Sequence, residues 1–435
     1  MLDIYILSVF LFINLGLFLL KISVSITTSG IFSLIICIYS IIIVLRHQNK
    51  RVTFSTVVLL YTIATQFGLV IPYIIFGRGV VQNYSSYTLR FLEGPNIIYA
   101  MYIANIAILS YTIANRIVPI VEIKSSSMLL TKSYDGMKAM FKLKIISTAL
   151  LSIVLCFFLF HFFTGGTSIV STYEVFRASS AYNSSLYSYI LILFYVGTLY
   201  LASSGKIKDN KISWGMWILI VLIFSLNGNK GEFMYALLSV VGLYGVKGNK
   251  INIKMILLIF LILFVLIPFI TSFRDVGILT NINNIDINFT DAFAEMGMQI
   301  RTSVYVLDDI GSGIQEFLFG KSYYLPFINI MLFFISGKNV ATSQISLRLG
   351  GMGFSQVSES YLNLGILGVI VFFFFVSYFL TILENKENNN YQLAYLGSIT
   401  CVLINATRNY FAFVPGQILI VTVIYLVIKK FKIKI

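Results

Sequence analysis

The segment ESYLNLGILGVIVFFFFVSYFLTIL, residues 359–383, decides the fold class of this chain. After Glu359 it carries no charged side chain, and it exceeds the roughly 20 apolar residues that a helix needs to cross a hydrocarbon core. Backbone polar groups cannot stay unpaired in lipid, so a single apolar segment spans a bilayer only as an α-helix. The segment therefore predicts a transmembrane helix.

The rest of the chain repeats this pattern. Of its 435 residues, 58% are hydrophobic and 11% charged, and the mean hydropathy is +0.89, more than a soluble core of this size accommodates. Further apolar runs lie at residues 2–20, 28–45, 52–76, 96–118, 143–163, 186–204, 212–230, 231–246, 255–270, 391–406 and 412–428. We predict one all-α polytopic membrane domain, residues 1–435, with about twelve transmembrane helices.

Charge sets the orientation of these spans. Lysine-rich segments at residues 124–144, 206–211, 247–254 and 429–434 fall on the same predicted side, which is the cytoplasm by the positive-inside rule. Both ends of the chain then lie inside. Residues 271–358, between the ninth and tenth predicted spans, form a large outward loop.

Cysteine and histidine show no pattern of a disulfide framework or a zinc site. Cys37, Cys156 and Cys401 lie within apolar runs, and His47 and His161 are far apart. The sequence therefore predicts neither a structural metal nor a cofactor.

Arginine is distributed against the topology bias. Lysine gathers on the predicted cytoplasmic side, whereas most arginines lie on the outer side, at Arg78, Arg90, Arg177, Arg274, Arg301, Arg348 and Arg408. A guanidinium group binds phosphate through two parallel hydrogen bonds, so this set is what a pyrophosphate-binding site would use. Solvated loop charges paired with nearby acids are the alternative.

The seventh and eighth predicted spans are short. Together they cover residues 212–246, whereas two full crossings need about 40 residues. Their turn, which contains Lys230 and Glu232, is therefore expected inside the bundle, where ionisable side chains are costly and typical of functional sites. Both residues are candidates for substrate binding, with mutual neutralisation as the alternative.

The outward loop contains the candidate catalytic residues. Residues 289–310 have helical character, with Glu295 on one stripe and with Arg301 and Asp308 together on another. Glu295 is the first candidate for a general base and Asp308 the second. Arg301 is the candidate for stabilising a phosphate.

Two further features adjoin this loop. Residues 323–335 are apolar but too short to span and contain Pro326, so we expect a re-entrant or interfacial element. Glu359 opens the tenth span, a position that a helix N-terminus favours for an acid. Arg408, in the last outward turn, is flanked by amide and aromatic residues and is a candidate phosphate or sugar contact.

Three motifs together resemble the Wzy-type polymerases of O-antigen and capsular oligosaccharide repeat units. They are Asn227-Gly228-Asn229-Lys230-Gly231-Glu232, Phe293-Ala294-Glu295-Met296-Gly297 followed by Arg301, and Gly353-Phe354-Ser355 leading into Glu359-Ser360-Tyr361-Leu362-Asn363-Leu364-Gly365-Ile366-Leu367-Gly368. The resemblance covers residues 212–383, and the first two hundred residues match in hydropathy only. The family often has arginine in the apex turn where this chain has Lys230.

The resemblance implies a GT-C-like glycosyltransferase fold in the bacterial inner membrane, with the active site on the outer face. A glycan on undecaprenyl pyrophosphate would move to a hydroxyl of the next lipid-linked repeat, with cationic side chains neutralising the leaving pyrophosphate without a metal. A chain-length regulator is a further implied partner, and nucleic acid is not. The substrate-binding candidates are Arg177, Lys230, Glu232, Arg274, Arg348, Glu359 and Arg408.

Two other functions compete with the polymerase. An O-antigen ligase would be expected to carry a histidine in the loop, and residues 271–358 contain none. A flippase or another secondary transporter would show repeated halves and interrupted helices near the midplane, whereas here the charge is concentrated in one outer loop.

Overall fold

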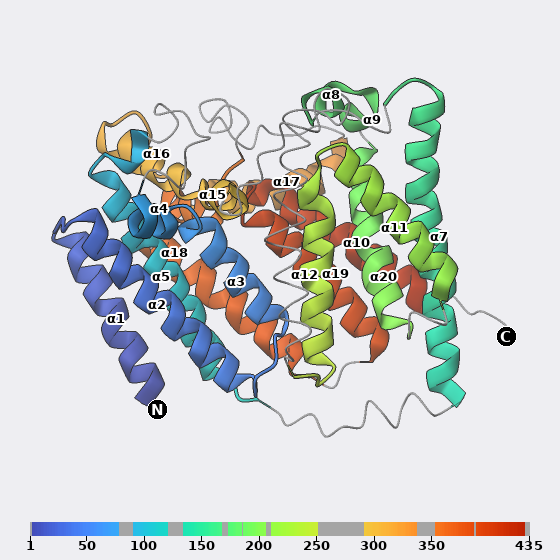
Figure 1. The fold of residues 1–435 in the computed structure, drawn as a ribbon, viewed down its shortest axis with the longest axis horizontal. Helices are drawn as coiled ribbons and strands as arrows, with labels where there is room; N and C mark the ends of the chain where they lie inside the picture. The colour runs from blue at the N-terminus through green and yellow to red at the C-terminus, as the bar shows by residue number, and fades with distance from the viewer. Residues whose placement is uncertain are drawn as a thin grey trace.

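The computed structural model describes residues 2–77, 90–120, 134–167, 173–184, 186–205, 210–250, 291–336, 353–386 and 389–430. Within them every regular element is a helix, as the predicted all-α class requires. The long helices form a bundle (Figure 1). Their bounds are α1 Leu2–Leu19, α2 Ile26–His47, α3 Phe54–Phe67, α4 Val70–Phe76, α5 Asn96–Ile117, α7 Tyr134–Phe163, α10 Tyr187–Ser203, α11 Lys211–Leu226, α12 Lys230–Val246, α18 Gln356–Glu384, α19 Asn390–Ala406 and α20 Val414–Lys430.

Six of the predicted spans correspond to helices that are long and apolar enough to cross a membrane. They include α1, α2, α5, most of α7, α18 and the segment Phe411–Lys430. Helices α10 and α11 are shorter apolar helices, and α12 and α19 are 17 residues long. The predicted span 255–270 lies outside the described residues. A polytopic membrane protein is therefore confirmed, and the number twelve stays a prediction.

Helix α5 is the centre of the first half of the bundle. Of its most apolar membrane-length window, 89% is buried, against 11% for α1, and it packs against α1, α2 and α18. The small side chains of Ala100, Ala104 and Ala107 lie on one face of α5 and are fully buried. Such residues let neighbouring helices approach closely, which is how helices associate without a hydrophobic driving force.

Helix α12 joins the two halves by packing directly on α3. At Gly245 an added Cβ atom would lie 2.0 Å from the backbone oxygen of Val52, so only glycine permits this approach. On its other side α12 contacts α10 and α19, and α10 in turn packs against α7. The N-terminus of α12 is thereby fixed relative to both halves.

Two predicted spans are interrupted. Residues 52–76, expected as one helix, divide near Gly68 into α3 and α4, which are bent by 54° relative to one another. Helix α18 is broken at Leu364 and Gly365, where Gly365 has a φ of 61° that glycine adopts without strain. The first part of α18, from Gln356 to Asn363, is consequently buried in the protein.

The helix expected over residues 289–310 is two helices, α15 Asp291–Gly297 and α16 Ile300–Gly311. The prediction of one continuous helix is therefore wrong, because Glu295 and Arg301 belong to different helices. Residues 323–335 lie in helix α17, Lys321–Ser336, which contains Pro326 and contacts α18 and α20.

The shorter helices gather at one end of the bundle. Helices α8 Tyr173–Ala178 and α9 Ser180–Asn183 lie there with α15, α16 and α17, at the end opposite the N-terminus (Figure 1). The predicted topology has these segments on the outer side, and that orientation stays a prediction.

A buried carboxylate organises the other end. Glu384, at the end of α18 and 1% exposed, accepts hydrogen bonds from the Ser55 amide at 3.0 Å, the Thr53 hydroxyl at 2.9 Å and the Gln48 amide at 3.1 Å. A carboxylate at this position satisfies the free N–H groups at the start of α3. Glu384 therefore ties α18 to α2 and α3.

Candidate functional site

Lys230 is the first residue of α12 and follows the turn expected inside the bundle. Gly228, with φ 67°, makes that turn, and the Asn229 side chain donates a hydrogen bond to the Tyr187 hydroxyl at 2.7 Å. The Lys230 side chain is 8% exposed and forms an ion pair with Glu295 of α15, whose side chain is 21% exposed. Two predicted site residues from distant parts of the chain thus meet in a shielded place.

Arg408 approaches the same place from the turn between α19 and the 3₁₀ helix η6, Phe411–Phe413. Its guanidinium interacts electrostatically with the Glu295 carboxylate and with the phenols of Tyr61 and Tyr235. It also interacts with Glu232, in the first turn of α12. We call the following residues the charged cluster: Tyr61, Lys230, Glu232, Tyr235, Glu295 and Arg408.

The two tyrosines are the members of the charged cluster that the sequence did not suggest. Tyr61 on α3 and Tyr235 on α12 are buried, and their rings meet edge to face with centroids 5.9 Å apart. The signal for Tyr235 is weak: it stands one turn after Glu232 and so shares its helix face. Tyr61 lies within an apolar run, and nothing in the sequence around it indicates a functional role.

The turn that carries Arg408 is held by the start of α18. The Phe354 amide donates to the Arg408 carbonyl at 3.2 Å, and the Phe354 ring stacks on Tyr410 with centroids 4.9 Å apart. The Glu359 carboxylate accepts a hydrogen bond from the Phe411 amide at 2.8 Å. The structure thus places Glu359 behind the Arg408 turn, where it supports the charged cluster.

Helix α15 reaches the charged cluster through a close backbone approach. An added Cβ atom at Gly297 would lie 2.0 Å from the Leu69 nitrogen and 2.6 Å from the Gly68 carbonyl carbon. The end of α15 therefore seats on the break between α3 and α4. This seat fixes the position of Glu295, two residues earlier.

Arg301 lies on α16, apart from the charged cluster. The residue is 8% exposed, its guanidinium carbon lies 5.9 Å from the centre of the Tyr305 ring, and it forms no ion pair within the described residues. Burial lowers its pKa, and Tyr305 opposes this shift. The neighbouring hydroxyls of Thr302 and Ser303 bond to Ser358, at 2.5 and 2.8 Å, and fix α16 to α18.

The remaining predicted residues lie elsewhere. Asp308 accepts a hydrogen bond from the Asn96 side chain and so links α16 to the start of α5. Arg177 is exposed on α8. Arg274 and Arg348 are outside the described residues.

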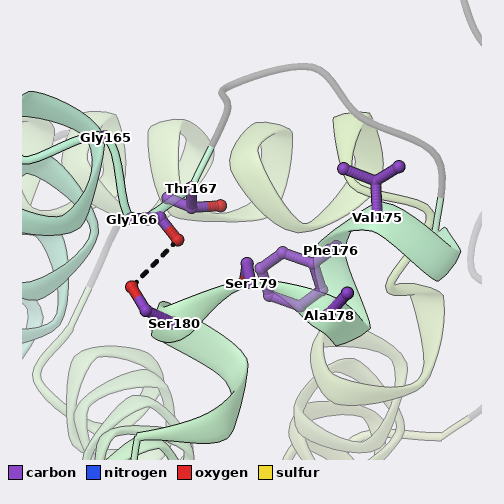
Figure 2. Close-up of a pocket in the computed structure, with 8 residues that line it drawn as sticks. All are labelled: Gly165, Gly166, Thr167, Val175, Phe176, Ala178, Ser179 and Ser180. Atoms are coloured by element: carbon purple, nitrogen blue, oxygen red, sulfur yellow. Dashed lines mark hydrogen bonds between the residues drawn. The ribbon is translucent and has the colours of Figure 1, made fainter.

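A separate pocket opens at the same end of the bundle, beside α8 and α9 (Figure 2). It has a volume of about 540 Å³ and is lined by Gly165, Gly166, Thr167, Val175, Phe176, Ala178, Ser179 and Ser180. None of these side chains ionises, so the pocket differs in chemistry from the charged cluster.

The charged cluster combines two cations, two carboxylates and two phenols from α3, α12, α15 and the turn after α19. Two cations on converging elements can bind an anion with several oxygens, such as a phosphate ester. A carboxylate beside them can accept a proton. In the described part of the chain no three histidine, cysteine or acidic side chains come together as metal ligands would.

Comparisons with known proteins give a consistent picture. The model of the family described as O-antigen polysaccharide polymerase Wzy matches residues 3–434. Protein CapE of Staphylococcus aureus is 30% identical over 395 residues, which cover 88% of this chain and 86% of that protein. No solved structure matches the chain.

Proposed function

The chain belongs to the O-antigen polysaccharide polymerase Wzy family, and we propose that it transfers a glycan from undecaprenyl pyrophosphate to a hydroxyl of the next lipid-linked repeat. As a member it is a membrane glycosyltransferase-type enzyme of O-antigen or capsular polysaccharide synthesis, acting on a lipid-linked oligosaccharide. The observation that carries the proposal is the charged cluster, in which cations and a carboxylate from α12, α15 and the turn after α19 converge. The family favours this polymerase over the ligase and the flippase.

In the proposed reaction the acceptor hydroxyl attacks the carbon that joins the glycan to pyrophosphate. A glycosidic bond forms, the bond to the pyrophosphate oxygen breaks, and the hydroxyl proton passes to Glu295. The leaving pyrophosphate departs as an anion, and Arg408 and Lys230 neutralise its charge. The atoms and charges balance without a further reactant.

The Lys230–Glu295 ion pair suggests how substrate prepares the base. A pyrophosphate that binds Lys230 competes with Glu295 for the ammonium group, which frees the carboxylate to accept a proton. Glu295 therefore remains the first candidate for the base. Asp308 is the weaker one, since its hydrogen bond to Asn96 fits a structural role.

Arg301 is proposed as a second phosphate contact. Arg301 is largely buried and has no acidic partner among the residues that the structure describes. Such a cation is unfavourable, and a bound anion would relieve that cost. Arg177, Arg274 and Arg348 stay proposed substrate contacts. We also propose a GT-C-like fold, a site on the outer face of the bacterial inner membrane and a chain-length regulator as partner.

The proposed function is tested with purified protein in lipid discs and the lipid-linked repeat extracted from producing cells. A ladder of longer glycans is expected. It should persist in excess chelator because cationic side chains neutralise the charge of the leaving pyrophosphate. A ladder that needs added magnesium or manganese would contradict metal independence. No ladder under either condition would contradict the polymerase itself.

Gly297→Ala is expected to lower kcat about a hundredfold, the cost of misplacing a catalytic group by about 1 Å. The added methyl group has no room against Gly68 and Leu69, so α15 and Glu295 must shift. The measurement is the rate of ladder formation. The control is Gly311→Ala, where nothing lies within 4 Å of the added atom. Equal rates in both variants would show that the seat of α15 does not matter.

A further inference from the structure

The pocket beside α8 and α9 has the size of a ligand site. Its volume of about 540 Å³ falls within the range of roughly 300–1,000 Å³ that small-molecule sites occupy. It lies beside the turn after α7, and Figure 2 shows Thr167 and Val175 on opposite sides of the pocket. The proposed reaction has so far made no use of it.

The described residues that line the pocket are neutral, and they include both polar and apolar groups. The Ser180 hydroxyl donates to the Gly166 carbonyl at 3.2 Å, and the Ser179 hydroxyl accepts from the Tyr182 amide at 3.3 Å. Val175 and Ala178 supply small apolar surfaces. A pyranose ring presents hydroxyls around its edge and C–H groups on its faces, so this lining suits a neutral sugar better than a phosphate.

A short series of contacts connects the pocket to the charged cluster. Phe176, buried in the lining, packs against Tyr182 and Tyr187 with ring centroids 5.6 and 6.0 Å away. The Tyr187 hydroxyl accepts the hydrogen bond from Asn229, the residue before Lys230. One layer of aromatic side chains therefore links the pocket to the turn that carries Lys230.

We propose that this pocket binds a neutral sugar unit of the lipid-linked oligosaccharide while the charged cluster binds its pyrophosphate, an inference that rests on the proposed function. The substrate has both parts, a neutral glycan and a charged linkage. The two sites lie at the same end of the bundle (Figure 1). One is neutral and the other charged, as are the two parts of the substrate. The pocket then contributes affinity and selects the repeat unit, whereas the charged cluster carries out the transfer.

The test uses the free oligosaccharide that mild acid releases from the lipid-linked repeat, so that the probe has neither lipid nor pyrophosphate. Binding to the purified full chain is followed by saturation-transfer NMR. Ala178→Trp fills the pocket and should weaken oligosaccharide binding about tenfold or more. Ser180→Ala should weaken it about fivefold by removing one hydrogen bond between the Ser180 hydroxyl and the sugar. In the polymerisation assay both variants should raise KM and leave kcat within about twofold.

Two variants separate this inference from the proposed function. Leu186→Trp adds the same ring at an exposed residue that does not line the pocket, and it should bind the oligosaccharide as the unaltered protein does. Arg408→Ala should lose polymerisation but retain oligosaccharide binding. If the unaltered protein polymerises but does not bind the free oligosaccharide, or Ala178→Trp binds it normally, the pocket assignment is wrong and the polymerase stands. If the protein binds the oligosaccharide but forms no ladder, the proposed function fails and the sugar site stands.

Discussion

Replacing Arg408 with alanine is expected to lower kcat/KM for chain elongation about a thousandfold, the upper range for removing one electrostatic contact to a developing anion. Arg408 is the arginine whose guanidinium interacts electrostatically with Glu295, Tyr61 and Tyr235. Arg408→Lys should recover little, because an ammonium group keeps the charge but loses the two-pronged geometry of a guanidinium. The measurement is the glycan ladder in cells together with the rate of the purified enzyme.

The cellular pattern identifies which step fails. A polymerase defect leaves single repeats exported and attached, a ligase defect leaves long chains on the lipid carrier, and a flippase defect leaves repeats inside. Lys321→Ala removes an equal charge from an exposed position at the start of α17 and should have little effect. Normal ladders in Arg408→Ala would show that Arg408 is not needed for elongation. Equal harm from Lys321→Ala would mean that charge density matters rather than this particular side chain.

The sequence predicted the helical membrane class and most helix positions because hydropathy follows directly from the cost of apolar surface in water and polar backbone in lipid. It did not reveal the breaks near Gly68 and at Gly365. Glycine is common in membrane helices, so a glycine within an apolar run does not by itself predict a break in the helix. The break between α15 and α16, near Met298, likewise depends on tertiary packing, since it lies where Gly297 meets the α3–α4 corner.

The members of the charged cluster were predictable in unequal degree. Lys230 and Glu232 were noticed because ionisable groups within a membrane helix pair are costly. Their approach to Glu295 and Arg408 was not predictable, since these four residues lie on three separate segments, and hydropathy does not specify how those segments pack. Tyr61 could not be selected at all, being one of 27 tyrosines in a chain rich in aromatic residues.

The second large effect is expected from Glu295. Glu295→Gln should lower kcat about a thousandfold with a small change in KM, since a general base contributes roughly 10²–10⁴-fold. A structural explanation competes, because Glu295 pairs with the shielded Lys230, and removing one partner of such a pair is destabilising in itself. The unfolding temperature of Glu295→Gln measures that loss. The double variant Lys230→Met with Glu295→Gln should recover it by removing the uncompensated charge.

Chemical rescue decides between the two roles of Glu295. In Glu295→Ala a small carboxylate such as formate can enter the space that the side chain leaves and accept the hydroxyl proton in its place. Formate should therefore restore part of kcat in Glu295→Ala and nothing in Arg408→Ala, whose missing group is a cation. If the double variant polymerises at the normal rate, or if formate has no effect while the unfolding temperature is lowered, then Glu295 serves only to hold Lys230. In that case the proton acceptor lies elsewhere, with Asp308 and Glu232 the first two carboxylates to replace.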